Sequence, residues 1–186
     1  MAHVTTRRSA RFVLRDATAQ WHARVDALFS EADLAGRGGY GRFLQAQAAA
    51  FLPIERALDL EGINKVVVDW PARRRAHLLC EDLAALGLAI PPLEPMPIFI
   101  GAPAMLGAAY VLEGSRLGGA LLRRSVPAAF PQAFLSGGST TAWRDFIVVL
   151  DAGLVTTPDL EAAIAAACNT FASFEQSGRR LLGNST

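Results

Sequence analysis

Three glycines in one predicted helix are the first sign of a functional site in this chain. Gly114, Gly118 and Gly119 interrupt residues 107–124, which otherwise have the apolar periodicity of a buried helix. Each glycine inside a helix costs roughly 1 kcal/mol relative to alanine, so three within six residues need a reason. A backbone without side chains can approach another backbone or a flat ligand closely. Because Gly114 and Gly118 are four residues apart, they share one helix face.

His22 lies in an earlier helical segment and is the strongest candidate for a metal ligand. The residues on its helix face, at spacings of three, four and seven, are Arg15, Ala19, Asp26 and Phe29. A neutral imidazole binds iron through one nitrogen, and the other nitrogen then needs an acceptor, which Asp26 can supply. A lone helical histidine is more often structural. Opposite a glycine-rich helix, however, it suggests a haem held between the two helices, with Arg15 placed to meet a propionate.

The composition favours one globular domain and gives no sign of a nucleic-acid partner. The chain has 186 residues, 52% of them hydrophobic, and a formal net charge of +1. The densest basic run, Arg73 to Arg75, is interpreted as a solvated helix face. The two cysteines, Cys80 and Cys168, form neither a disulfide framework nor a zinc site, and their sparseness fits a reducing compartment.

The chain shows no export signal or membrane span, so we expect a cytoplasmic protein with no membrane partner. Residues 1–11 are polar and basic and lack the apolar core of a signal peptide. The uncharged run at residues 95–112 contains three prolines and is shorter than the ~20 apolar residues that a membrane helix needs.

Periodicity and helix-breaking residues predict a single all-α domain over residues 1–186, with frayed ends at 1–10 and 181–186. Glycine- or proline-rich loops are expected at 36–39, 89–103 and 134–139, and irregular chain at 61–70, where 66–68 could form a short strand. The expected helices are 5–30, 40–59 with a kink at Pro53, 71–86 ending at Gly87, 104–124, 140–152, and one from Thr157 as N-cap to Arg180.

Four segments resemble the haem oxygenase family. Leu14-Arg-Asp-Ala-Thr with His22 resembles the family's proximal helix, and Tyr110-Val-Leu-Glu-Gly-Ser-Arg-Leu-Gly-Gly119 resembles its distal helix. Two further segments, Trp143-Arg-Asp-Phe146 and Thr170-Phe-Ala-Ser-Phe-Glu175, resemble its C-terminal helices. The likeness covers about residues 11 to 178 and is greatest to the bacterial branch that makes biliverdin, often beside bacterial phytochromes.

The resemblance implies a helical bundle in which haem, both substrate and cofactor, lies between the proximal and distal helices. Haem is opened with O₂ and electrons to biliverdin, CO and ferrous iron, the electrons coming from a reductase or ferredoxin. His22 is then the iron ligand, and Gly114, Gly118 and Gly119 keep the distal backbone close to the iron. Tyr110 either joins a distal hydrogen-bond network or is structural, and Phe171 packs on haem or in the core.

Two positions depart from the family's pattern. Many members have an aspartate where this chain has Ser115, which can organise water but carries no charge. Arg144 matches one basic position expected to contact the propionates, whereas Val148 stands where many relatives have a second arginine. Arg15 and Arg11 can compensate for that loss.

Two other functions remain open from the sequence: a haem-binding or haem-sensing protein without turnover, and a helical interaction protein that has lost haem. Retention of His22 and of all three glycines argues against the second. A bacterial phytochrome is a possible recipient of the biliverdin.

Overall fold

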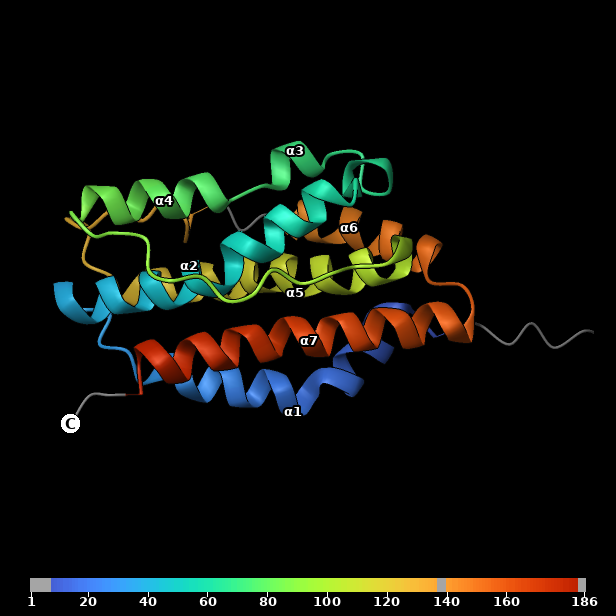
Figure 1. Cartoon of the computed structure of the whole chain (residues 1–186), viewed down its shortest axis with the longest axis horizontal. Helices are drawn as coiled ribbons and strands as arrows, with labels where there is room; N and C mark the ends of the chain where they lie inside the picture. The colour runs from blue at the N-terminus through green and yellow to red at the C-terminus, as the bar shows by residue number, and fades with distance from the viewer. Residues whose placement is uncertain (1–7, 137–139, 184–186) are drawn as a thin grey trace, which may run out of the picture.

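Every regular element in the described part of the chain is helical, as predicted. The computed structural model describes residues 8–136 and 140–183, and Figure 1 shows the arrangement. The elements are α1 (Ala10–Ser30), α2 (Arg37–Leu60), η1 (Ile63–Lys65), α3 (Trp70–Arg73), α4 (Ala76–Ala85), α5 (Gly101–Leu122), η2 (Arg123–Ser125), α6 (Thr140–Gly153) and α7 (Thr157–Leu181).

The C-terminal helix α7 organises the bundle, because it packs against α5, α1 and α2. In Figure 1, α7 and α1 run side by side along the lower edge, with α2 and α5 above them. Helix α6 packs on α5, and α4 packs on α2. The buried face of α2 is rich in alanine, which lets neighbouring helices approach its backbone closely.

Gly107 allows two helices to pack in close contact. A Cβ at this position would collide with the backbone carbonyl of Ala163 and would come within 2.7 Å of its Cα. The two residues bring the first halves of α5 and α7 together, and only glycine permits that approach.

Helix α7 begins with a capping box, one residue earlier than predicted. The N-cap is Thr156, not Thr157; its hydroxyl accepts a hydrogen bond from the Asp159 N–H at 3.3 Å. The Asp159 carboxylate in turn accepts from the Thr156 N–H at 2.8 Å. Two of the helix's unpaired N–H groups are thereby satisfied.

The single helix predicted over 71–86 is two helices, because a buried carboxylate interrupts it. Glu55 on α2 accepts hydrogen bonds from the backbone N–H groups of Arg75 and Ala76, at 2.8 and 3.0 Å. Arg74 is extended, with φ −61° and ψ 138°, and α4 starts anew at Ala76. Gly87 follows α4 with φ +66°, as a helix-stopping glycine should.

The prediction that Arg73 to Arg75 form a solvated helix face is wrong. Arg73 and Arg75 are buried, 5% and 2% exposed, and of the three only Arg74 is exposed. Smaller corrections concern the loops. Helix α2 begins at Arg37 inside the expected 36–39 turn, no strand forms at 66–68 within the described residues, and α5 begins at Gly101. The predicted Gly-Gly loop falls partly on residues 137–139, which lie outside the described residues.

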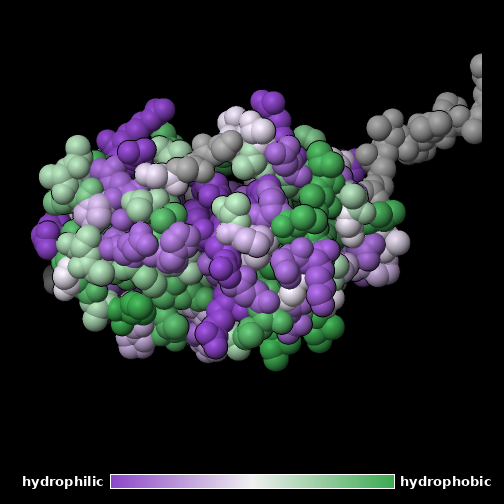
Figure 2. Space-filling view, turned by 90° about the horizontal axis from the view of Figure 1, so that it is seen from above, coloured by the Kyte–Doolittle hydropathy of each residue, from purple (hydrophilic) through white to green (hydrophobic). Residues whose placement is uncertain are grey.

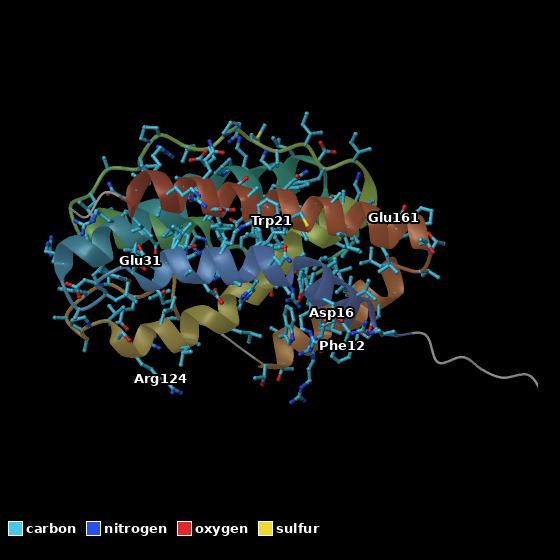
Figure 3. The ribbon with its side chains drawn as sticks, turned by 90° about the horizontal axis from the view of Figure 1, so that it is seen from below. Phe12, Asp16, Trp21, Glu31, Arg124 and Glu161 are labelled. Carbon is cyan, nitrogen blue, oxygen red and sulfur yellow. The ribbon has the colours of Figure 1, made fainter. Side chains whose placement is uncertain are left out.

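Helix α1 is tied to α6 at its first residues. The Ala10 N–H and the Ser9 hydroxyl both donate to the Asp151 carboxylate, at 2.7 and 3.0 Å, and Ala10 is 1% exposed. Seen from below in Figure 3, α1 runs between α7 and the second half of α5, from Phe12 and Asp16 towards Glu31. This position sets the face of α1 that carries His22 towards α5.

Hydrophobic and hydrophilic residues are interspersed on the face seen from above in Figure 2. Among the described helices, none has the length and apolarity required to cross a bilayer.

Candidate functional site

A cavity of about 560 Å³ lies between α1 and the second half of α5. Its size falls within the ~300–1,000 Å³ that is typical of small-molecule pockets. The residues predicted for the site that line it are His22, Asp26, Tyr110, Gly114, Ser115, Gly118, Gly119 and Phe171. Residues almost 150 positions apart in the sequence are therefore brought together around one space.

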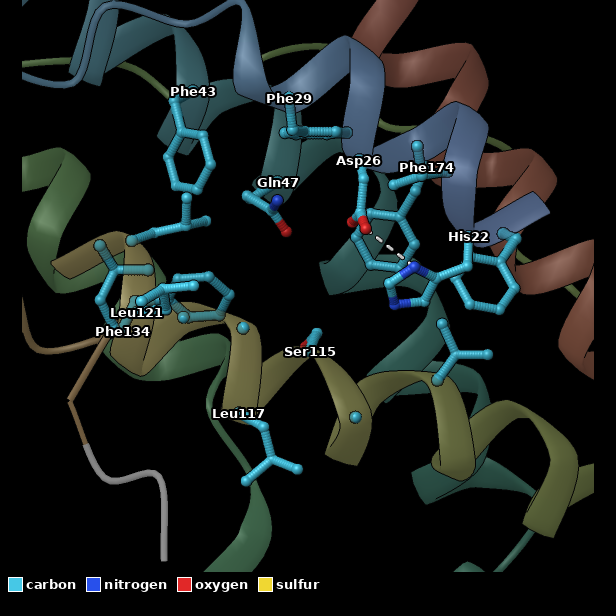
Figure 4. A pocket seen from close by; sticks show the side chains of 18 of the residues that line it. His22, Asp26, Phe29, Phe43, Gln47, Ser115, Leu117, Leu121, Phe134 and Phe174 are labelled. Carbon is cyan, nitrogen blue, oxygen red and sulfur yellow. Dashed lines mark ion pairs between the residues drawn. The ribbon is translucent and has the colours of Figure 1, made fainter. Parts of the chain in front are cut away.

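His22 and Asp26 form the polar pair on the α1 wall. The His22 Nδ1 lies 2.9 Å from Asp26 Oδ2, and Figure 4 marks this ion pair beside the open space. Both side chains are largely exposed, 62% and 67%. A carboxylate on Nδ1 fixes the ring's orientation and leaves Nε2 as the nitrogen that can bind a metal. The Phe171 ring contacts the imidazole edge-on, with centroids 5.7 Å apart.

The α5 wall is bare backbone at two positions. A Cβ added at Gly114 or at Gly118 would meet no atom within 4 Å, so both glycines border open space. Gly119 differs, because its Cβ would make an ordinary contact, 3.5 Å, with Leu135. The expected glycine face is therefore formed by Gly114 and Gly118, and Gly119 turns towards the 134–135 segment.

Ser115 is held between its own helix and a buried arginine. Its hydroxyl donates to the Leu112 carbonyl at 2.7 Å and accepts from Arg75 Nη2 at 2.8 Å. The same Nη2 donates to the Leu112 carbonyl at 2.6 Å. Ser115 is thus fixed as an acceptor of the arginine's hydrogen bond at the wall of the cavity.

Arg75 is a charged lining residue that sequence reasoning missed. It is 2% exposed, and its guanidinium lies 5.0 Å from the ring centroids of both Phe51 and Phe134. Burial, with the nearby Arg116 charge, lowers the pKa of Arg75 to about 9, so it remains a cation at neutral pH. Nothing in the local sequence separates it from Arg74; only the contact with Glu55, twenty residues earlier, turns it inward.

A second buried network holds α3 to the distal helix. The Glu113 carboxylate, which carries a charge into an apolar helix, accepts from Arg73 Nη1 at 2.7 Å and from Arg116 Nη2 at 2.9 Å. Arg116 also donates to the Arg73 carbonyl, and Arg73 to the Ala142 carbonyl of α6. With every carboxylate oxygen paired, the network can anchor the second half of α5 without a catalytic role for Glu113.

Most of the remaining lining is apolar. Phe29, Phe43 and Phe174 border the cavity, and Gln47 from α2 presents an amide in it (Figure 4). Tyr110 packs on Trp143 with centroids 5.9 Å apart, and burial raises the pKa of its hydroxyl. Such a lining suits a large flat apolar ligand with few polar groups.

Arg15 and Arg144, predicted to meet propionates, are not among the residues that line this cavity. Arg15 is exposed, donates to Asp16 at 3.0 and 3.1 Å, and lies over the Phe12 ring. Arg144 is exposed on α6. A ligand that reaches them must extend beyond the cavity towards the start of α1.

The site can hold a metal only if the metal brings most of its own ligands. Within the described ranges, no group of three or more His, Cys, Asp or Glu side chains could bind a bare ion. His22 supplies a single nitrogen, which suffices for iron in a macrocycle but not for a free ion.

Comparisons with known proteins agree on one family, although no protein-family model matches the chain. A haem oxygenase of Xanthomonas campestris pv. campestris is 35% identical over 142 residues, 73% of this chain and 86% of the relative. The haem oxygenase PigA of Pseudomonas aeruginosa is 26% identical over 164 residues, 82% of this chain and 83% of the relative.

Two solved structures share the fold. The NO- and CO-bound haem oxygenase from Neisseria meningitidis superposes with a TM-score of 0.83 at 22% identity, covering 94% of this chain and 92% of the other. The haem oxygenase from Leptospira interrogans superposes with a TM-score of 0.72 at 17% identity, covering 94% of this chain and 100% of the other.

Proposed function

The chain belongs to the haem oxygenase family, and from that premise we propose how its own residues carry out the reaction. The enzyme is an oxidoreductase that opens haem with O₂ and electrons to biliverdin, CO and ferrous iron. In this proposal the cavity between α1 and α5 would hold the haem, and His22 would bind its iron.

One observation carries this assignment. The cavity has, on one wall, a histidine whose Nδ1 is held by a carboxylate and, on the other wall, a helix that exposes its backbone at two glycines. His22 with Asp26 supplies the first half, and the open backbone at Gly114 and Gly118 supplies the second. His22 supplies one nitrogen to the cavity, and the rest of the lining is mostly apolar, which suits an iron that is already held in a flat macrocycle. Haem therefore fits the residues present.

The protein's part in the reaction is to hold the substrate and shape the space above it. Haem itself supplies the iron that activates O₂. Asp26 would orient the His22 ring and raise its basicity as a ligand. Gly114 and Gly118 would leave room only for a small molecule on the side away from His22. Ser115, fixed by Arg75, would order water there for proton delivery, in place of the aspartate that many relatives have.

The propionates would extend out of the cavity towards exposed arginines. We assign them to Arg144, which matches a basic position of the family's pattern, and to Arg15, which lies on the helix face of His22. Arg15 would exchange its bond with Asp16 for a propionate, at little cost because the pair is exposed. Tyr110 and Phe171 would pack along the haem edge.

The wider setting is proposed on the same premise. An external reductase or ferredoxin would supply the electrons. The resemblance of the sequence to the phytochrome-associated branch suggests that a bacterial phytochrome would receive the biliverdin. A cytoplasmic location agrees with the sparse cysteines.

The test is to add haem and then a reductant in air and follow the absorption spectrum. Loss of the Soret band with growth of a broad red band supports turnover to biliverdin. A stable Soret band under the same conditions would instead support haem binding alone.

A further inference from the structure

Unlike the neighbouring Arg73 and Arg116, Arg75 has no hydrogen-bonded carboxylate on its guanidinium among the described residues. Arg73 and Arg116 both donate to Glu113. Among the described residues, the Arg75 guanidinium donates only to the Leu112 carbonyl and to the Ser115 hydroxyl. The Glu55 carboxylate beneath it bonds to backbone N–H groups of the chain, not to the guanidinium.

Arg75 is also incompletely hydrogen-bonded despite its burial. Its Nε has no partner within the described residues, and the side chain is 2% exposed. A buried cation normally has a paired anion, because removal of a charge from water is costly. Two aromatic faces, Phe51 and Phe134, lie 5.0 Å from the guanidinium and compensate in part. The Glu113 and Glu55 carboxylates act on the guanidinium only through space, without a hydrogen bond to it, and Arg75 lines the cavity.

The other charge in the lining does not cancel it. Asp26 lies on the α1 wall, where its carboxylate is engaged with His22 and is mostly exposed to solvent. Arg75 acts from the α5 wall, through the serine that stands between Gly114 and Gly118. The cavity therefore has a carboxylate on the histidine side and, on the glycine side, a cation with no hydrogen-bonded carboxylate among the described residues.

We propose that Arg75 makes the Ser115 side of this cavity a subsite for a small monoanion, facing the position that His22 gives to the metal. The inference rests on the proposed function, because it requires haem on His22. A carboxylate at position 115 would neutralise Arg75 directly, so the serine of this chain creates the subsite. Anions of the size of azide and fluoride are the ligand class, and larger neutral bases gain nothing from Arg75.

The experiment measures ligand affinities of the ferric haem complex by spectral titration, with azide and fluoride as anionic probes and imidazole as the neutral one. Arg75→Gln removes the cation, and Ser115→Asp leaves it in place but pairs it. Both variants should lose about tenfold or more in azide and fluoride affinity relative to imidazole, as a unit charge in a partly desolvated site implies. Two controls separate charge from shape. Ser115→Asn matches the aspartate in size without its charge, so it should lose much less of the anion-to-imidazole ratio than Ser115→Asp does. Arg74→Gln removes a neighbouring exposed cation outside the cavity and should keep the wild-type ratio.

Each outcome decides something. If Arg75→Gln fails to fold, Ser115→Asp against Ser115→Asn still tests the charge. Equal loss in the aspartate and asparagine variants would mean that size alone matters and would overturn the proposal. A third result is that both charge variants bind haem through histidine and keep the wild-type ratio of anion to imidazole affinity. That result would overturn the subsite proposal and leave the proposed function standing. No histidine-ligated haem spectrum in the wild type would overturn both.

Discussion

The two halves of α5 use glycine for opposite purposes. In the first half, a Cβ at Gly107 would collide with the Ala163 backbone of α7. In the second half, a Cβ at Gly114 or Gly118 would meet no atom within 4 Å. One glycine brings two helices together, and the other two keep a space empty. The same residue type therefore has to be interpreted from what surrounds it, and not from its helix propensity.

The two halves also differ in what holds them in place. The first half is fixed by direct packing on α7 at Gly107. The second half borders the cavity and is held by polar contacts, from Glu113 to Arg73 and from the Leu112 carbonyl to Arg75. Changes in the first half should therefore affect stability, and changes in the second half should affect ligand binding.

The largest effect is expected from Gly107→Ala. The added methyl group must push α5 away from the α7 backbone, which cannot rotate aside as a side chain could. We expect a loss of about 3 kcal/mol or more in the free energy of unfolding, or a fall of about 6–12 °C in Tm. Chemical denaturation of the haem-free protein measures it. An unchanged midpoint would show that the helices can separate without cost, and the comparison of the two halves would fail.

His22→Ala should have the next largest effect, on haem and not on the fold. The side chain is 62% exposed, so the haem-free protein should unfold as the wild type does. Removal of a group that hydrogen-bonds to a metal ligand lowers metal affinity about ten- to a hundredfold. Removal of the ligand itself should therefore weaken haem binding by about a hundredfold. The ferric spectrum should lose its histidine-ligated signature and regain it with added imidazole. An unchanged signature without imidazole would refute the assignment.

The open half of α5 could be predicted from the sequence because the glycines that define it lie close together in the chain. Gly114 and Gly118 are four apart on one helix, and their cost in helix propensity implies a ligand or a partner. His22 with Asp26 is equally local, since one turn of α1 joins them. The all-α fold follows in the same way from apolar periodicity and helix-breaking residues.

What the sequence could not show depends on residues far away in the chain. Gly107 lies in the same apolar pattern as its neighbours, and its partner Ala163 belongs to another helix. Arg75 looks like one of three surface arginines until Glu55 breaks the helix and turns it inward. Arg144 matched a family position, yet no spacing rule could show that it lies outside the cavity lining.

Filling the space beside Gly118 should have an intermediate effect. A leucine there would project into the cavity and compete with the ligand for volume, since nothing now lies within 4 Å of a Cβ. We expect Gly118→Leu to fold normally and to bind haem about tenfold more weakly, the cost of overfilling a site by a few methylene groups. A haem titration measures it. Wild-type affinity would indicate that the ligand does not approach this wall.

The smallest expected effect comes from a single methyl group on the open half, and it has the opposite sign to that at Gly107. Gly114 has helical backbone angles, and an added Cβ would meet nothing within 4 Å, so Gly114→Ala removes only the conformational freedom of the unfolded chain. We expect it to raise the free energy of unfolding of the haem-free protein by about 0.4–1 kcal/mol. The methyl group would then border the space above bound haem, so biliverdin should form more slowly while haem affinity stays within about twofold. Measured beside Gly107→Ala under the same denaturing conditions, the two variants should shift the midpoint in opposite directions. If Gly114→Ala destabilises as much as Gly107→Ala does, the second half of α5 is packed and not open. If it is more stable and fully active, the open glycine wall is not what the reaction needs.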